Sequence, residues 1–235
     1  MRKIKKISIT SELIYLAGIG LLAFAVNLMS IANLGLSAIV SPAYVLSLKV
    51  DSLSYGQAEY IIASILFILF CLIMKKFRIA YLSSFITGIL YATMADFFKN
   101  VFPLFSTSLD KLSIRILYFI IGMLLSALAI AFFYKTYFYP QIYDFFVKEI
   151  AKKYQFSIQK FKTAFDSSFL LLAMTLSFIF FHQLKGIGIG TFVMAMCNGT
   201  LIQFFTQILD HYFNFVPLFF PLANYLENGG NNNGI

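Results

Sequence analysis

Six runs of mostly apolar residues, each close to the length of a membrane-crossing helix, divide this 235-residue chain. About 20 such residues in helical conformation cross the hydrocarbon core of a bilayer. The runs therefore predict an all-α, polytopic helical membrane protein with six transmembrane helices. The predicted spans are residues 13–31, 57–75, 79–98, 115–134, 167–184 and 190–209.

Composition and charge placement agree with this fold class. The chain is 60% hydrophobic and 12% charged, whereas a soluble domain is roughly 45–50% apolar. Its net charge of +8 would suit a nucleic acid, but Lys and Arg stand between the apolar runs and therefore report membrane orientation. With the N-terminus in the cytoplasm, 13 of the 18 basic residues lie inside. We expect a multi-pass plasma-membrane protein with both termini cytoplasmic and no nucleic-acid partner.

One pattern occurs twice in the chain and predicts two structural repeats. Small residues spaced four apart end in a polar residue, and the same ladder returns 107 positions later. The ladders are Ser84, Gly88, Ala92 and Asp96 in the first copy, and Thr191, Ala195, Gly199 and Gln203 in the second. Ser54 likewise recurs as Ser157. Because each copy holds three spans, an odd number, the second copy must be inverted relative to the first.

The repeats set the predicted domain organisation. We expect a single membrane domain over residues 1–235, with repeat one at 13–100, repeat two at 115–213 and a disordered tail at 227–235. The basic start followed by an apolar run also resembles a cleaved signal peptide. The run at 13–31 is longer than a usual signal core and has a counterpart in the second half, which favours a retained span.

The small-residue ladders predict close helix packing. Small side chains at this spacing let two helix backbones approach each other in a membrane. A single ladder indicates packing alone. Two matched ladders predict that the third and sixth spans cross near a pseudo-two-fold axis.

The stretch after the first span of each copy contains a proline. Residues 32–56 are nearly uncharged and predict a re-entrant or broken helix. Residues 135–166 include a basic amphipathic run, which we expect to lie along the cytoplasmic leaflet and to bind anionic lipid at Lys148–Lys162. Solvation, or pairing with Lys162 or Lys148, is the expected role of Asp144 and Asp166.

Polar residues near the predicted centre form the candidate solute site. An intramembrane carboxylate such as Asp96 usually has a partner or a function, and the alternative is an interfacial residue beside Lys99. The glycine-rich turn before Thr191 exposes a helix N-terminus, which attracts carbonyl or anionic groups, or else it is a plain capped turn. The other polar residues suit a neutral solute, or they satisfy backbone groups freed by Gly35 and Pro42. The predicted substrate-binding residues are Asn27, Asn33, Gly35, Ser37, Ser41, Asp96, Gly190, Thr191, Asn198 and Gln203.

An enzyme or a metalloprotein is not predicted. The two histidines lack a metal-binding spacing, and no Ser-His-Asp arrangement has local support. Cys71 and Cys197 each lie inside an apolar run, which is typical of small buried side chains. We therefore expect no catalytic residue, no metal and no cofactor.

Three segments resemble those of the YczE/YitT-like family of bacterial membrane proteins. They are Ala32 to Ser37, Ser41 to Ser47 and Leu53 to Gln57, and Gly186 to Thr191 fits the same pattern. The resemblance implies a bacterial plasma-membrane protein of five or six helices and no settled activity.

These observations predict a transporter or permease for a small neutral or zwitterionic solute, working by alternating access between inverted repeats. The alternative is a non-transporting membrane subunit, either a regulatory or assembly partner or the substrate-binding component of a larger transporter. Its docking surface would be Lys148–Lys162. A homodimer is compatible with either function.

Overall fold

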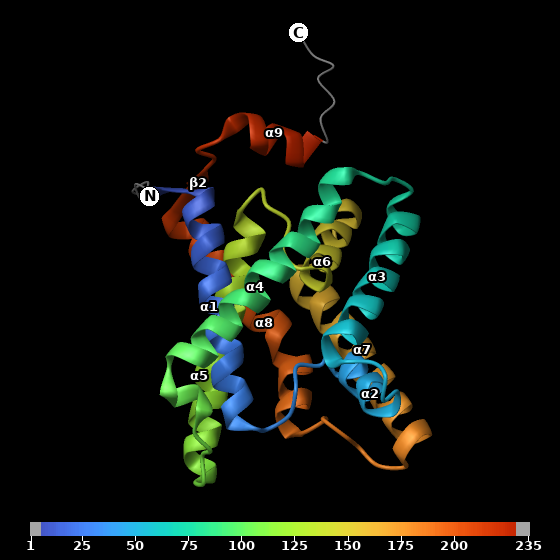
Figure 1. The fold of residues 1–235 in the computed structure, drawn as a ribbon. Helices are drawn as coiled ribbons and strands as arrows, with labels where there is room; N and C mark the ends of the chain where they lie inside the picture. Colours follow the sequence, from blue (N-terminus) through green and yellow to red (C-terminus); the bar gives the residue numbers. More distant parts are fainter. Residues whose placement is uncertain (1–5, 229–235) are drawn as a thin grey trace.

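The computed structural model describes residues 6–228, and the fold is almost wholly helical (Figure 1). Six segments are long and apolar enough to cross a membrane, so the architecture is that of a multi-pass membrane protein. They are α1 (Ser11–Ala32), α3 (Tyr55–Met74), η1 (Ile79–Leu82) continuing into α4 (Ser83–Val101), α5 (Leu112–Lys135), α7 (Ile158–Phe181) and α8 (Ile189–Tyr212). The shorter elements are β1 (Ile7–Thr10), α2 (Ser41–Lys49), η2 (Pro103–Ser106), α6 (Ile142–Tyr154), β2 (Phe213–Val216) and α9 (Phe220–Asn228).

The all-α class and the six spans are confirmed, with one boundary wrong. The fifth helix, α7, begins at Ile158 rather than at residue 167. Lys162 and Asp166 interrupt the apolar run there, but both are buried and pair with each other across one helical turn. Because the charges are compensated inside the protein, the helix continues through them.

The centre of the bundle is the pair α1 and α5, which lie along each other. Gly122 of α5 permits this approach, since a Cβ atom there would stand 2.6 Å from Met29 Cγ and 2.8 Å from the Ala25 carbonyl oxygen. Helix α4 packs on α1, and α8 packs on α5. The predicted crossing of the third and sixth spans is therefore wrong, because α4 and α8 do not pack along each other within residues 6–228.

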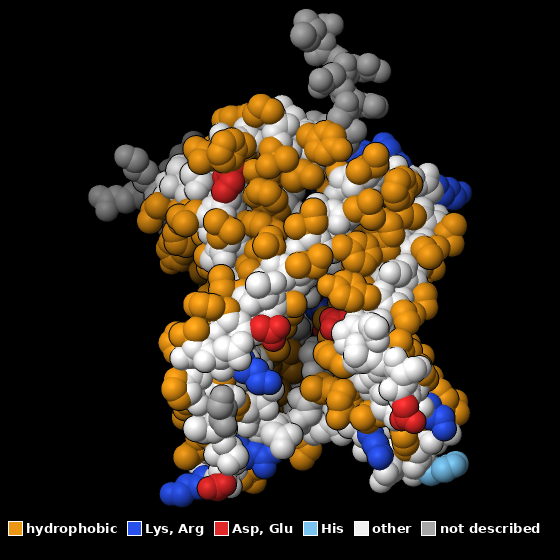
Figure 2. Space-filling view, viewed as in Figure 1, with side chains coloured by type: hydrophobic (Ala, Val, Ile, Leu, Met, Phe, Trp, Pro, Cys, Tyr) orange, Lys and Arg blue, Asp and Glu red, His pale blue; other side chains and the backbone are white. Residues whose placement is uncertain are grey.

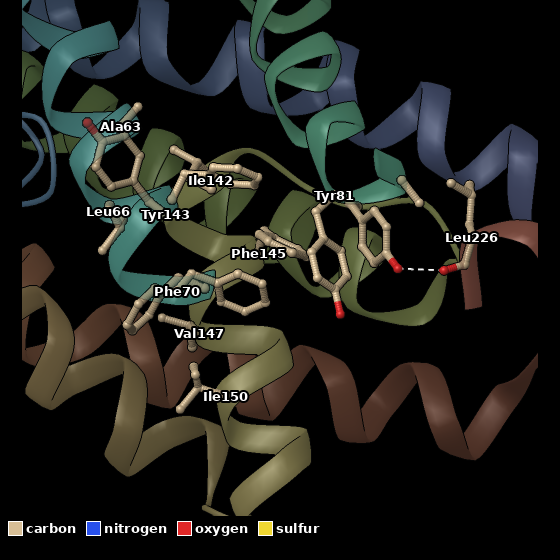
Figure 3. Close-up of a cluster of buried hydrophobic side chains, with 14 of the residues drawn as sticks. Ala63, Leu66, Phe70, Tyr81, Ile142, Tyr143, Phe145, Val147, Ile150 and Leu226 are labelled. Atoms are coloured by element: carbon tan, nitrogen blue, oxygen red, sulfur yellow. Dashed lines mark hydrogen bonds between the residues drawn. The ribbon is translucent and has the colours of Figure 1, made fainter. Parts of the chain in front are cut away.

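The short helices α2 and α6 each pack against both α3 and α7. The α6 side chains Tyr143, Phe145 and Val147 are at most 2% exposed and belong to the largest hydrophobic cluster (Figure 3). The prediction that this segment lies on the leaflet surface is wrong, because its apolar face is covered by protein. The matching prediction for the first half is confirmed as a broken helix: α1 ends at Ala32, and a short α2 follows under the cover of α3 and α7.

The first and last described elements, β1 and α9, lie at the same end of the molecule, called here the terminal end (Figure 1). Strands β1 and β2 pair in parallel, with Ile7 opposite Phe213. Helix α9 then returns over the bundle, where Leu226 is buried and its carbonyl oxygen accepts a hydrogen bond from the Tyr139 hydroxyl. The predicted disordered tail is thus wrong for Glu227 and Asn228, which are helical, while 229–235 lie outside the described residues.

Candidate functional site

Two loops meet at the end of the molecule opposite the termini. The Leu36 amide donates to the Gly186 carbonyl oxygen at 3.2 Å, and the Gly190 amide donates to that of Leu34 at 2.8 Å. Gly35 has a φ of +119°, and a Cβ on it would lie 2.5 Å from Thr191 Oγ1. The structure thus joins three predicted site residues, Gly35, Gly190 and Thr191, in a direct contact that leaves no space for a solute between them.

Four other predicted residues, Asn27, Asn33, Ser37 and Ser41, take part in backbone hydrogen bonds through a side chain or a carbonyl oxygen. The Asn27 side chain donates to the Ala95 carbonyl oxygen at 2.9 Å and ties α1 to α4. Asn33 ends α1 in a left-handed conformation, and its carbonyl oxygen accepts from Arg115. Ser41 Oγ donates to the Ser37 carbonyl oxygen at 2.9 Å across the start of α2. Their observed contacts are those of helix ends and helix packing.

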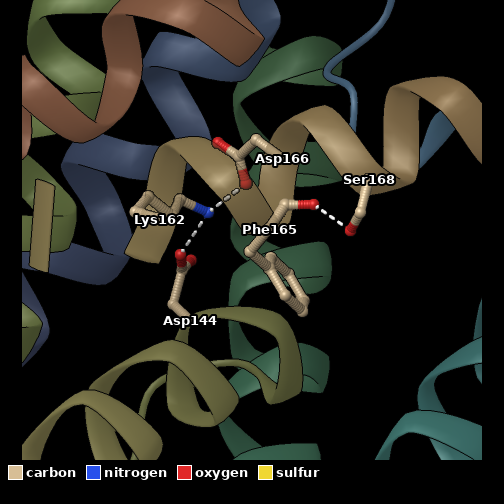
Figure 4. A network of polar contacts seen from close by, with 5 residues as sticks. All are labelled: Asp144, Lys162, Phe165, Asp166 and Ser168. Atoms are coloured by element: carbon tan, nitrogen blue, oxygen red, sulfur yellow. Dashed lines mark hydrogen bonds and ion pairs between the residues drawn. The ribbon is translucent and has the colours of Figure 1, made fainter. Parts of the chain in front are cut away.

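A buried charge cluster joins α6 to α7 (Figure 4). Lys162 Nζ lies 2.9 Å from Asp144 Oδ1 and 2.9 Å from Asp166 Oδ1. The Lys162 side chain is 0% exposed, and those of Asp144 and Asp166 are 5% and 4% exposed. Of the roles expected for these carboxylates, the structure shows pairing with Lys162 for both. Lys162 does not face solvent, so the lipid-binding prediction now depends on the exposed residues Lys152, Lys153 and Lys160.

Two buried oxygen atoms in and beside the charge cluster lack a well-formed hydrogen bond. Lys162 donates a hydrogen bond to Asp144, whereas the 2.9 Å contact with Asp166 Oδ1 lacks good hydrogen-bond geometry. The predicted site residue Asn198 of α8 contacts Asp166, and its own Oδ1 has no partner in the described structure. Sequence reasoning named Lys162 as one possible partner of these carboxylates but missed its burial, because a lysine in an apolar run was read as the edge of a span. The four-residue spacing of Lys162 and Asp166 is the signal for a pair on one helix face.

Helices α7 and α8 close tightly on each other at the terminal end. A Cβ on Gly199 would lie 2.6 Å from the Gln159 carbonyl oxygen and 2.6 Å from Thr163 Oγ1. Gln203 Oε1 accepts from the Gln159 amide at 3.1 Å, so the predicted site residue Gln203 caps the start of α7. Gln159 Nε2 also donates to Thr200 Oγ1 at 2.9 Å. The second small-residue ladder is therefore a packed helix contact.

The first ladder, on α4, is open instead. Ser84 at its start is buried, but nothing lies within 4 Å of a Cβ built on Gly88, and Ala92 and Asp96 are exposed. Within residues 6–228, helices α3 and α4 do not pack along each other, although the rings of Phe67 and Phe85 approach near the terminal end, with centroids 5.5 Å apart. Figure 2 shows the molecule hollowed beneath α4, with acidic side chains at the upper edge of the hollow.

The α3–α4 gap holds a half-buried carboxylate that sequence reasoning missed, Glu59. It lies near enough to the hydroxyls of Tyr55, Tyr91 and Tyr143 to act on them electrostatically. Asp96 acts on Tyr91 in the same way. A lone acidic residue within the first turn of a predicted span was the available signal. The gap thus brings together two carboxylates and aromatic hydroxyls from α3, α4 and α6.

A cavity of about 700 Å³ opens at the terminal end, between the end of α5, α6 and the segment after α8. Lys148 lines it and donates to the Thr136 carbonyl oxygen at 2.8 Å and to that of Phe133 at 3.1 Å, which caps α5. Burial lowers the pKa of the Lys148 ammonium to about 8. The Lys148 ammonium is thus occupied by backbone carbonyl oxygens and is not available for the lipid binding expected at Lys148–Lys162. Tyr134 also lines the cavity, and its hydroxyl lies close to Asp144 and Asp166, so the cavity reaches the neighbourhood of the charge cluster.

Comparison with known proteins gives a family but no activity. No curated protein and no solved structure matches the chain. A family model described as a family of unknown function, DUF6198, matches residues 9–207, which include all six candidate spans except the last residues of α8. The resemblance to YczE/YitT-like proteins stays a prediction. The chain belongs to the DUF6198 family of unknown function.

Proposed function

We propose that this protein is a transporter for a small neutral or zwitterionic solute, and that it works by alternating access between two inverted repeats. One observation carries the proposal. The ladder of small residues is packed in one half, where a Cβ on Gly199 would lie 2.6 Å from α7 atoms, and open in the other, where a Cβ on Gly88 would meet nothing within 4 Å. A pair of repeats that adopt unequal conformations is the basis of alternating access in inverted-repeat transporters.

The helix contacts support an exchange of the two halves. Packing of α4 on α1 matches that of α8 on α5, and α2 and α6 each bridge α3 and α7. The two halves differ in one contact: α7 packs along α8, whereas α3 does not pack along α4. In the proposed cycle, α3 and α4 close while α7 and α8 open, which transfers access from one end of the molecule to the other.

The chemistry of the α3–α4 gap supports the solute class. Its walls combine apolar side chains, tyrosines and the two carboxylates Glu59 and Asp96. Such a mixture suits a small solute with limited charge. With the N-terminus in the cytoplasm, the gap opens outward, and the tight α7–α8 contact closes the cytoplasmic side.

A pair of matched disulfides tests the cycle. In a background lacking Cys71 and Cys197, Gln159→Cys with Thr200→Cys joins two side chains that already touch. The positions at the same offsets in the first half are Gly56 and Thr93. We expect the Gln159/Thr200 pair to crosslink at once, and the Gly56/Thr93 pair to crosslink only as the protein samples the opposite state. Each crosslink should stop solute flux in liposomes, and reduction should restore it.

The flux assay itself screens small neutral and zwitterionic solutes in liposomes. Flux of none of them, together with no crosslinking at Gly56/Thr93, would refute transport. Co-purification of a stoichiometric membrane partner in that case would support the alternative, a non-transporting subunit.

A further inference from the structure

Glu59 is a carboxylate inside a candidate span with no cationic partner among residues 6–228. The three ion pairs of the described fold involve Lys135 and Lys162, and neither contacts Glu59. An ionised carboxylate within a membrane span usually pairs with a charge or serves a ligand. Because Glu59 is half-buried and lies within electrostatic reach of Tyr91 on α4, a group that enters the α3–α4 gap can reach it.

Glu59 interacts with the Tyr55 hydroxyl but with no cation, and a second polar group near it has no partner in the described structure. Tyr143 of α6 is 2% exposed, and its hydroxyl makes no hydrogen bond in the described structure. Its ring packs against Ala63 and Leu66 of α3, with the hydroxyl at the edge of the hydrophobic cluster (Figure 3). That hydroxyl lies within the electrostatic reach of Glu59. A buried hydroxyl left without a partner costs free energy, so the gap holds two polar groups that a ligand would satisfy together.

The corresponding position in the second half carries an ammonium group. Ser54 and Ser157 are the N-cap residues of α3 and α7, and Glu59 and Lys162 each follow their serine by five residues. In the second half, the Lys162 ammonium binds two carboxylates, and α7 is closed on α8. In the first half, a carboxylate stands at this position, no ammonium accompanies it, and the helices are apart.

We propose that Glu59 binds the primary ammonium group of the transported solute, a step that builds on the transport function proposed above. The carboxylate accepts a charge-assisted hydrogen bond from the ammonium. The rings of Tyr55 and Tyr91 offer faces for a cation, and the Tyr143 hydroxyl accepts a further hydrogen bond. Asp96, exposed on α4 at the same gap, supplies a second negative charge that draws α4 toward the bound cation. The solute is therefore an amine or an amino zwitterion.

Binding of a lysine side-chain mimic tests the site. Purified protein in detergent is titrated calorimetrically with n-butylammonium and with its uncharged analogue butan-1-ol. We expect wild type to bind the ammonium and not the alcohol, and Glu59→Gln to weaken ammonium binding about tenfold or more. Tyr143→Phe should weaken it about threefold to tenfold. The matched control Glu149→Gln changes a carboxylate that lines the cavity at the terminal end, and it should leave binding unchanged.

A conformational readout separates loss of the site from loss of folding. We expect n-butylammonium to increase crosslinking of Gly56→Cys with Thr93→Cys in wild type but not in Glu59→Gln. Without n-butylammonium, crosslinking of Gln159→Cys with Thr200→Cys must be as efficient in Glu59→Gln as in wild type, which shows that Glu59→Gln remains folded.

The outcomes distinguish this inference from the transport proposal. Equal ammonium binding by wild type and Glu59→Gln, or equal binding of the alcohol, would overturn the Glu59 site even if the protein moves other solutes. Glu59-dependent binding without any flux would instead support the site and refute transport.

Discussion

Glu59 in α3 and Lys162 in α7 stand at the same distance from the N-cap serines of their helices, yet they meet opposite environments. Lys162 is fully buried between two carboxylates, whereas Glu59 is half-buried and unpaired in the described fold. The helix that carries Lys162 is closed on its neighbour, and the helix that carries Glu59 is not. The difference between the two halves is thus one of charge compensation as well as of packing.

Replacing Lys162 by Met should destabilise the protein strongly. The substitution leaves Asp144 and Asp166 buried without their counter-charge, and breaking a buried ion pair in this way costs about 3–5 kcal/mol. Thermal unfolding in detergent measures the loss. Lys160→Met removes an exposed lysine from the same helix and should change the free energy of unfolding by less than about 0.5 kcal/mol.

Removing the carboxylates as well should reverse much of that loss. The triple variant Lys162→Met, Asp144→Asn, Asp166→Asn contains no uncompensated charge, so it should unfold at a higher temperature than Lys162→Met alone. If Lys162→Met were as stable as wild type, the charge cluster would not hold α6 to α7.

The two ladders should respond differently to a larger side chain. Gly199→Val places a side chain against the Gln159 carbonyl and Thr163, and overpacking of this kind costs about 1–3 kcal/mol. Ala92→Val, at the same ladder position of α4, extends into the open gap and should leave the unfolding temperature close to that of wild type. Equal losses from both variants would mean that α4 is packed as tightly as α8.

The sequence predicted the positions of the helices better than the contacts between them. Apolar run length sets the spans because the bilayer thickness is fixed, so five of the six were located closely. The partner of a small-residue ladder is not encoded in its own spacing, and Gly199 faces α7 rather than the expected α4. The environments of two lysines were mispredicted for a related reason. Charge alone places Lys162 and Lys148 in solvent, whereas tertiary contacts supply the groups that bind their ammonium groups inside the fold.

Gly35 should be intolerant of a side chain. Its φ of +119° disfavours any other residue, and an added Cβ would lie 2.5 Å from Thr191 Oγ1 and 2.6 Å from the Gly188 amide nitrogen. Gly35→Ala should therefore lower the free energy of unfolding by about 1–3 kcal/mol. The control Gly56→Ala adds a methyl group where nothing lies within 4 Å, and it should be neutral. An unchanged unfolding temperature for Gly35→Ala would show that the contact between the two loops contributes little.

The pH dependence of stability should report the buried ammonium of Lys148. Its pKa falls from 10.5 to about 8 because burial disfavours the charged form. Below pH 8 the folded and unfolded states are both protonated, and the cost of burying the charge is present in full. Between about pH 8 and 10.5 the unfolded state keeps its proton while the folded state has released it, so stability rises with pH.

Lys148→Met, which does not titrate at this position, isolates that contribution. The stability difference between wild type and Lys148→Met should move in favour of wild type by about 1–3 kcal/mol from pH 8 to 10.5. Other groups titrate equally in both proteins and cancel in the difference. A difference that stays constant over this interval would mean that Lys148 keeps an ordinary pKa, and hence that the carbonyl oxygens of Phe133 and Thr136 compensate its burial completely.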